Sequence, residues 1–271
     1  MTRALLLLTL CIALFCRAAH AQTNFLRNGV TAHRGNSGER PENTLSAFES
    51  AIAVGADWIE LDVYLTKDRQ LVVTHDPDTG RVGDKKLRVA DSTFAELQTV
   101  DVATRFRTLN NLAAAECPPA RMPLLADVLK LIVKQNRTRV SIQPKDECVQ
   151  AAFDIIRELK AEKWVGFNDG SLNKMRQVKT LSKAVPVFWD RNADTGIDKD
   201  IRTAREEGFE CLVVHRNGLT KEKADKIRQA GLEVGVWTVD SEAEMRSFLA
   251  LGVGRFYTDH PALLLRLQQM R

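Results

Sequence analysis

Two acidic residues lie two positions apart in an otherwise apolar run. Glu60 and Asp62 belong to the segment Ile-Glu-Leu-Asp-Val, so both side chains are expected on the same side of a strand. Carboxylates in such a buried run must be paired or metal-bound, because burying a bare charge is costly. Two oxygen donors facing one way suit a hard cation such as Mg²⁺ or Ca²⁺. We therefore expect Glu60 and Asp62 to be metal ligands.

Two of the five histidines, His33 and His75, follow β-type segments near these carboxylates. Two imidazoles can supply a base and an acid at neutral pH, and either of them could be the base. Arg34 and Lys145 add two cations that can hold a phosphate, the first by a planar fork and the second as a point charge. A divalent cation, two basic side chains and an acid/base pair together describe the cleavage of a phosphodiester.

Short segments rich in Val, Ile and aromatic residues alternate with amphipathic helical segments from Gly29 onward. Continuous apolar runs of this kind are typical of strands buried on both faces of a parallel sheet. The predicted strands are Val30–His33, Trp58–Val63, Arg139–Gln143, Trp164–Phe167, Val185–Trp189, Cys211–Val214, Leu232–Val239 and Arg255–Thr258. Repeated strand–helix units with right-handed crossovers predict a (β/α)8 TIM barrel. A doubly wound sheet is the alternative, but no glycine-rich phosphate loop follows any strand.

Polar residues gather at the predicted carboxyl ends of these strands, where barrel active sites are built. In chain order they are His33, Arg34, Glu60, Asp62, Gln143, Lys145, Asn168, Trp237 and Asp259. We expect this end of the barrel to hold the site.

One connection is too short to hold a helix and predicts an antiparallel hairpin. The apolar run that contains Glu60 is followed by the polar turn Thr-Lys-Asp-Arg and a second β-like run that leads to His75. We expect Leu65 to pair with Gln70 across this turn. In that register Glu60 lies opposite His75, and Asp62 lies on the same face as Glu60. A slip of one residue would break this arrangement.

The segment from about residue 77 to residue 121 fits no strand–helix unit. Thr93 and Glu96 have the spacing of a capping box, which predicts a helix from near Thr93 to about Val100. We expect a small insertion on the barrel rim after the second strand, able to wall one side of a pocket. The helices predicted elsewhere are Asn43–Val54, Pro123–Lys134, Cys148–Leu159 and Ala243–Leu251.

The first 21 residues have the features of a secretory signal peptide. Arg3 precedes the apolar run Ala4–Phe15, and Ala19-His20-Ala21 is a small-x-small cleavage site. We expect residues 1–21 to be removed and residues 22–271 to form one domain, exported to the periplasm or the medium. A buried first helix or a membrane anchor is the alternative.

The composition excludes several classes of protein. With 44% hydrophobic and 27% charged residues the chain is not disordered, and no apolar run approaches the ~18 residues that span a bilayer. A net charge of +4 does not indicate a nucleic-acid partner. Three cysteines remain after the predicted cleavage, Cys117, Cys148 and Cys211, so at most one disulfide can form and the fold does not depend on a disulfide framework.

Several motifs together resemble the glycerophosphodiester phosphodiesterases, a family of barrels like that of the phosphatidylinositol phosphodiesterases. They are His33-Arg34-Gly35, Pro41-Glu42-Asn43-Thr44, Glu60-Leu61-Asp62-Val63, Thr66-Lys67-Asp68, His75-Asp76, Pro123-Leu124-Leu125, Trp237-Thr238-Val239 and Thr258-Asp259-x-Pro261. The resemblance implies hydrolysis of glycerophosphodiesters to glycerol 3-phosphate and an alcohol with a divalent cation, Mg²⁺ or Ca²⁺.

The resemblance also implies a role for each matched residue. His33 and His75 would be the acid/base pair, Arg34 and Lys145 the phosphate holders, and Glu60 and Asp62 metal ligands. Glu42 would support the site near Arg34 or the metal, and Trp237 would wall the glycerol or alcohol side.

The chain departs from the family pattern at one position. The third strand of the family carries Glu-x-Lys, but here it reads Gln143-Pro144-Lys145. A Gln oxygen can still bind Mg²⁺ or Ca²⁺ but brings no negative charge. We therefore expect Gln143 to be a weaker metal ligand and Gln143→Glu to tighten metal binding.

Two alternative functions follow from these residues. One is a phospholipase-type phosphodiesterase that acts on lipid head groups, for which the insertion offers only Arg105-Phe106-Arg107 as a membrane-facing segment. The other is a barrel that binds its ligand without turnover because Gln143 replaces Glu. The intact pair of histidines argues against the second.

Overall fold

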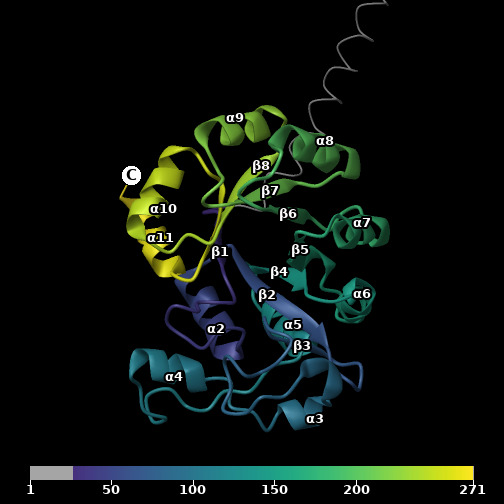
Figure 1. Ribbon diagram of the computed structural model, residues 1–271, viewed down its shortest axis with the longest axis vertical. Helices are drawn as coiled ribbons and strands as arrows, with labels where there is room; N and C mark the ends of the chain where they lie inside the picture. The colour runs from purple at the N-terminus through teal and green to yellow at the C-terminus, as the bar shows by residue number, and fades with distance from the viewer. Residues whose placement is uncertain (1–26, 271) are drawn as a thin grey trace, which may run out of the picture.

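A computed structural model describes residues 27–270, and within this range the chain forms a closed barrel (Figure 1). The predicted signal peptide lies outside the described residues. The strands are β1 (Val30–Ala32), β2 (Trp58–Leu65), β3 (Leu71–Val73), β4 (Arg139–Pro144), β5 (Val165–Asp169), β6 (Val187–Arg191), β7 (Cys211–His215), β8 (Glu233–Trp237) and β9 (Arg255–Thr258). All except β3 pair in parallel, and β1 pairs with both β9 and β2, which closes the ring. This confirms the predicted TIM barrel.

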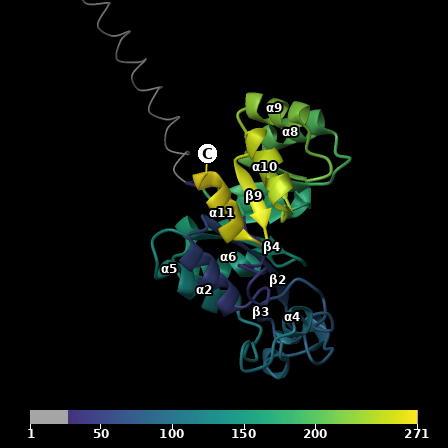
Figure 2. The same ribbon diagram turned by 90° about the vertical axis from the view of Figure 1, so that its left-hand side faces the viewer.

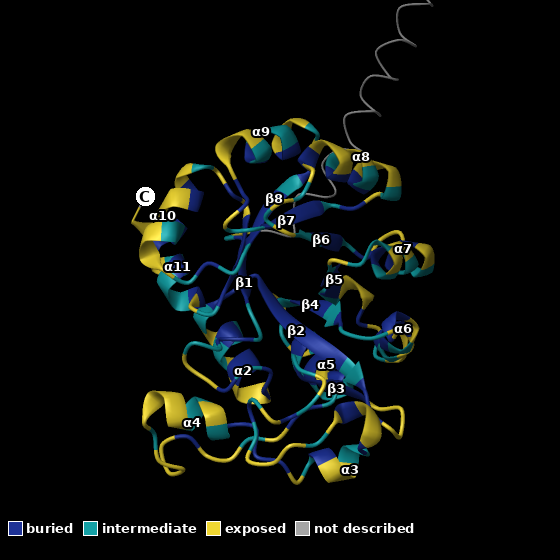
Figure 3. Ribbon diagram, in the orientation of Figure 1, coloured by how far each residue is buried: buried dark blue, intermediate teal, exposed yellow. Residues whose placement is uncertain are grey.

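The helices lie around the barrel and bury one face each against it. They are α2 (Leu45–Val54), α5 (Leu125–Val133), α6 (Val149–Glu158), α7 (Leu172–Leu181), α8 (Ile197–Glu207), α9 (Lys221–Gln229), α10 (Glu242–Ala250) and α11 (Pro261–Gln269), with a 3-10 turn η4 (Glu162–Trp164) before β5. Figure 3 shows buried strands inside and exposed outer faces on the surrounding helices. The predicted helices are all present. Their observed ends differ from the predicted ends where a capping residue sets the boundary. The helix α2, for example, begins after Thr44, whose side chain accepts a hydrogen bond from the Ala47 amide.

The hairpin after β2 is present, but the predicted register is wrong by one residue. Leu65 pairs with Leu71 rather than with Gln70, because Gln70 belongs to the turn, where its carbonyl accepts from the Thr66 amide at 2.9 Å. In this register a continued strand would place Leu61 opposite His75. His75 nevertheless lines one cavity with Glu60, because β3 ends at Val73 and the chain bends at His75, so strand alternation no longer sets its direction.

The expected insertion follows β3 at the end of the molecule opposite α8 and α9 (Figure 2). It contains η3 (Val89–Asp91), α3 (Phe94–Leu97) and α4 (Thr104–Asn110). Thr93 and Glu96 form the predicted capping box, although the helix ends at Leu97, and α4 was not predicted. A second, smaller core supports the insertion, built on Val72, Val82, Val89, Leu97, Val100, Val102 and Met122.

Two further expectations concern the described residues as a whole. Cys117, Cys148 and Cys211 are all buried and free, so no disulfide joins them. Within residues 27–270 no helix has the length and apolar character needed to cross a bilayer.

Candidate active site

His33 follows β1 in a sharp turn and is held by the other end of the chain. Its backbone amide donates to the Thr258 carbonyl at 2.9 Å, and its Nδ1 lies 2.7 Å from Asp259 Oδ1. Burial lowers the pKa of His33, but the hydrogen bond to Asp259 and the charge of Glu60 outweigh it, so the pKa is raised above its ordinary value. His33 is therefore poised to carry a proton.

His75 lies beyond β3 and, like His33, has a carboxylate at Nδ1. Its pKa is nevertheless shifted in the opposite direction. Its Nδ1 lies 2.7 Å from Asp76 Oδ1. Burial, together with the charges of Arg34 and Lys145, holds the pKa of His75 below its ordinary value. In both histidines the carboxylate engages Nδ1, which leaves Nε2 for a ligand. The two imidazoles thus have the same kind of partner at Nδ1 but favour different protonation states.

The two predicted metal ligands are buried two positions apart in the middle of β2. Glu60 and Asp62 are 2% and 0% exposed. Burial and the neighbouring Asp62 charge raise the pKa of Glu60 to about 7. Glu60 Oε2 accepts from the Arg34 backbone amide at 3.1 Å, and Asp62 Oδ2 accepts from Asn43 Nδ2 at 2.9 Å. Asn43 was not predicted as a site residue, although it belongs to the Pro-Glu-Asn-Thr motif.

The two predicted phosphate holders flank these carboxylates. Lys145 Nζ lies 3.0 Å from Asp62 Oδ1 and donates to Gln143 Oε1 at 2.5 Å. Arg34 Nε lies 3.7 Å from Asp62 Oδ2. That Nε is buried and donates no hydrogen bond within residues 27–270, so it is a donor available to an anion.

A cavity of about 320 Å³ at the carboxyl end of the strands brings most of the predicted residues together. It is lined by His33, Arg34, Glu60, His75, Gln143, Lys145, Asn168, Gly170, Asp190, Asn192, Trp237, Thr238 and Tyr257. Asp62 lies directly behind its wall, in contact with Arg34 and Lys145. Trp237, predicted to wall the site, is among the lining residues, and its indole nitrogen donates to the Arg191 carbonyl at 3.3 Å.

Glu42 lies outside this cavity and connects the barrel to the insertion. Its carboxylate accepts from Arg34 Nη1 at 2.9 Å and from both terminal nitrogens of Arg81 at 2.6 Å. Arg81 also pairs with Asp76, the partner of His75. Glu42 therefore contacts Arg34 and joins it to Arg81, an insertion residue that was not predicted.

The donor set is one that a hard divalent cation prefers. Glu60 and Asp62 offer carboxylate oxygens, and Gln143 offers an amide oxygen. Asp62 Oδ1 is buried and accepts no hydrogen bond of good geometry within residues 27–270, and a cation would relieve the repulsion between Glu60 and Asp62. Within residues 27–270 no group of three His, Cys, Asp or Glu side chains is placed to hold a metal ion by itself.

Sequence reasoning assigned no role to the end of β6. Asp190 lies there, faces the cavity, and accepts hydrogen bonds from Asn168 Nδ2 at 3.1 Å and Gln143 Nε2 at 3.2 Å. Burial raises the pKa of Asp190 to about 8. The sequence signal that could have identified Asp190 is an acidic residue in a strand otherwise rich in Val, Phe and Trp.

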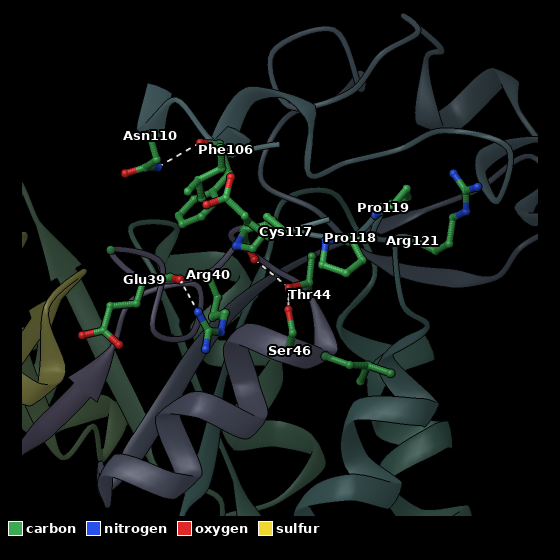
Figure 4. A pocket seen from close by; sticks show the side chains of 16 residues that line it. Glu39, Arg40, Thr44, Ser46, Phe106, Asn110, Cys117, Pro118, Pro119 and Arg121 are labelled. Atoms are coloured by element: carbon green, nitrogen blue, oxygen red, sulfur yellow. Dashed lines mark hydrogen bonds between the residues drawn. The ribbon is translucent and has the colours of Figure 1, made fainter. Parts of the chain in front are cut away.

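A larger cavity of about 890 Å³ lies between the insertion and the start of α2 (Figure 4). Its walls include Arg40, Thr44, Phe106, Cys117 and Pro118. It contains neither histidine and none of the residues predicted to bind metal or phosphate. The residues predicted to do the chemistry therefore do not line this larger cavity.

Comparisons with known proteins agree with this geometry. The model of the glycerophosphoryl diester phosphodiesterase family matches residues 33–263. Proteins described as glycerophosphodiester phosphodiesterases from Bacillus altitudinis and Caldanaerobacter subterraneus are 30% and 31% identical, over 89% and 88% of this chain and 98% and 96% of their own.

Solved structures share the fold. A putative glycerophosphoryl diester phosphodiesterase from Silicibacter pomeroyi has a TM-score of 0.79 at 23% identity, covering 89% of this chain and 93% of its own. An Oleispira antarctica phosphodiesterase in complex with sn-glycerol-3-phosphate has a TM-score of 0.77 at 21% identity, covering 90% of this chain and 98% of its own. Because the family model covers most of its length, the chain belongs to the glycerophosphoryl diester phosphodiesterase family.

Proposed function

We propose that this protein is an exported, divalent-cation-dependent enzyme that hydrolyses glycerophosphodiesters to glycerol 3-phosphate and an alcohol. The observation that carries the proposal is the pair of histidines, each bonded through Nδ1 to a carboxylate and both lining one cavity with Arg34 and Lys145. Family membership and the names of the bacterial relatives support the same reaction.

The opposed pKa shifts support one division of the two proton transfers. His75, with its pKa lowered, is neutral near pH 7 and takes the proton of the attacking water. His33, with its pKa raised, is the better acid and protonates the leaving alkoxide. Arg34 and Lys145 hold the phosphate oxygens while negative charge develops on them.

Glu60, Asp62 and the Gln143 amide oxygen would hold the cation. When bound, it supplies positive charge next to the phosphate oxygens and lowers the barrier to attack. Around it, Asn43 and the Arg34 backbone amide keep the two carboxylates in place. Trp237 walls the side of the cavity where the organic part of the substrate lies.

The test is hydrolysis of glycerophosphocholine by the wild type, His33→Ala and His75→Ala, with Mg²⁺, Ca²⁺ or a chelator present. We expect each variant to lose roughly 10²–10⁴-fold in kcat, the usual contribution of a general acid or base. His260→Ala is the matched control, because His260 is exposed and does not line the cavity.

Two results would contradict the proposal in different ways. Full activity in His33→Ala removes the acid/base assignment. Absence of turnover by the wild type with either cation favours the non-catalytic binding barrel instead.

A further inference from the structure

Asp190 lies in the same layer of the barrel as Gln143, although the two are 47 residues apart in the sequence. Gln143 is on β4 and Asp190 on β6, with β5 between them. Inward side chains of alternate strands form common layers in such barrels. This explains how the Gln143 amide reaches the Asp190 carboxylate across β5.

The hydrogen bonds around Gln143 run in one direction. A side-chain amide has a donor end and an acceptor end. Asp190 Oδ2 takes the donor end at 3.2 Å, so Gln143 Oε1 points away from it and accepts from Lys145 Nζ at 2.5 Å. The same Nζ lies 3.0 Å from Asp62 Oδ1. The Gln143 oxygen is thereby turned to the side of the cavity where the cation ligands lie.

A second contact keeps Asp190 in place. Asn168 Nδ2 also donates to Asp190 Oδ2, at 3.1 Å, and Asn168 Oδ1 accepts from Ser141 Oγ at 2.6 Å. The Asn168 amide is therefore held at both ends and presents its donor to Asp190. Within residues 27–270 no basic side chain forms an ion pair with Asp190, so these two amides are its polar partners.

We propose that Asp190 is a positioning residue that orients the Gln143 amide with its oxygen toward the cation, and that Asp190 is the reason why position 143 accepts an amide rather than a carboxylate. The inference rests on the proposed function, in which Gln143 is the third ligand. Asp190 acts through Gln143, because its carboxyl group contacts the amide end of Gln143 that faces away from Lys145 and Asp62.

This contact changes the expectation for Gln143→Glu. Glu at position 143 has no N–H to offer Asp190 Oδ2, so the hydrogen bond that orients the wild-type side chain is lost. The single substitution therefore gains little affinity for the cation. Adding Asp190→Asn supplies an amide donor at that position, which can hold the new carboxylate in the orientation that the cation requires.

The experiment titrates Mg²⁺ and Ca²⁺ by calorimetry into the whole protein without substrate. The variants are Gln143→Glu, Asp190→Asn, the double variant and Asp190→Leu. The control is Asp194→Asn, because Asp194 is an exposed acid on the connection that follows β6 and does not line the cavity. We expect Asp190→Asn to bind like the wild type, since its carbonyl oxygen can accept from both amides. Asp190→Leu loses about tenfold, and the double variant binds about tenfold more tightly than Gln143→Glu.

Each alternative outcome overturns the inference. One such outcome is that Gln143→Glu and the double variant bind the cation with equal affinity. The others are that a folded Asp190→Leu binds with wild-type affinity, or that the wild type binds no cation. If Asp190→Leu does not fold, the comparison of Gln143→Glu with the double variant still decides the question. Because no substrate is used, failure here is distinct from a lack of hydrolysis, which would contradict the proposed function.

Discussion

At the scale of single residues, the site separates two chemically identical side chains by their surroundings. Asp259 and Glu60 favour the charged form of His33, whereas burial and two nearby cations favour the neutral form of His75. Pairs of titratable groups whose pKa values are pushed apart mark the acid and the base of a site. The sequence left that assignment open, and the contacts made across the barrel mouth support the assignment proposed above.

Asp259→Asn tests the assignment through the pH profile of kcat/KM. Activity needs neutral His75, so it rises as pH increases through a pKa below the ordinary 6.5, and it needs protonated His33, so it falls above a pKa higher than 6.5. Loss of the Asp259 charge lowers the pKa of His33 and moves the alkaline limb to lower pH, while the acidic limb stays. A shift of the acidic limb instead would exchange the two roles.

At the scale of elements, the connection from β1 to α2 places Arg34 and Asn43 against the cation ligands. Both residues have positive φ, and the Asn43 amide donates to the Arg34 carbonyl at 2.9 Å, so the connection folds back on itself. Gly35 has φ +85°, and a Cβ there would lie 2.7 Å from the Ala47 Cβ of α2. The helix can pack this close only because position 35 is glycine.

Gly35→Ala is therefore expected to displace Arg34 and to destabilise the fold by about 1–3 kcal/mol, from positive φ and overpacking together. Urea unfolding and kcat/KM measure the two effects, and both should decrease. Gly254→Ala is the matched control, since its Cβ would meet only ordinary contacts at 3.8 Å or more. Unchanged stability and activity in Gly35→Ala would show that α2 can move aside.

At the scale of the whole molecule, barrel closure joins the two ends of the described chain. His33 and Asp259 are 226 residues apart and share one hydrogen bond. Asp57 Oδ2 accepts from the backbone amides of Arg27, Asn28 and Gly29 at 2.6–2.8 Å, which ties the segment before β1 to the barrel. These contacts are all made by residues after residue 26, so cleavage after Ala21 leaves them intact.

We accordingly expect the full-length chain, expressed in a bacterium with a secretion pathway, to appear outside the cytoplasm with its N-terminus at Gln22. Intact-mass measurement of the protein from the periplasm or the medium identifies the cleavage site. Ala21→Arg, which removes the small residue at that site, should retain the precursor mass. An uncleaved wild-type chain in the cytoplasm would contradict export.

The sequence by itself determined the features that follow from local periodicity and from general rules of topology. Strand–helix alternation predicted the barrel, and parallel strands put their polar carboxyl ends at one mouth, so His33, Glu60 and Gln143 could be grouped without coordinates. The Thr93 capping box likewise needs only a spacing along the chain.

Only the tertiary structure decided how those residues are paired. The hairpin turn moved the register by one residue, and the bend at His75 still lets its side chain line the same cavity as Glu60. The Arg81–Glu42 and Asp190–Gln143 contacts join elements distant in sequence, and their existence depends on the insertion folding onto the rim and on the stagger of the closed barrel. Such pairings are set by distances in space that no local pattern encodes.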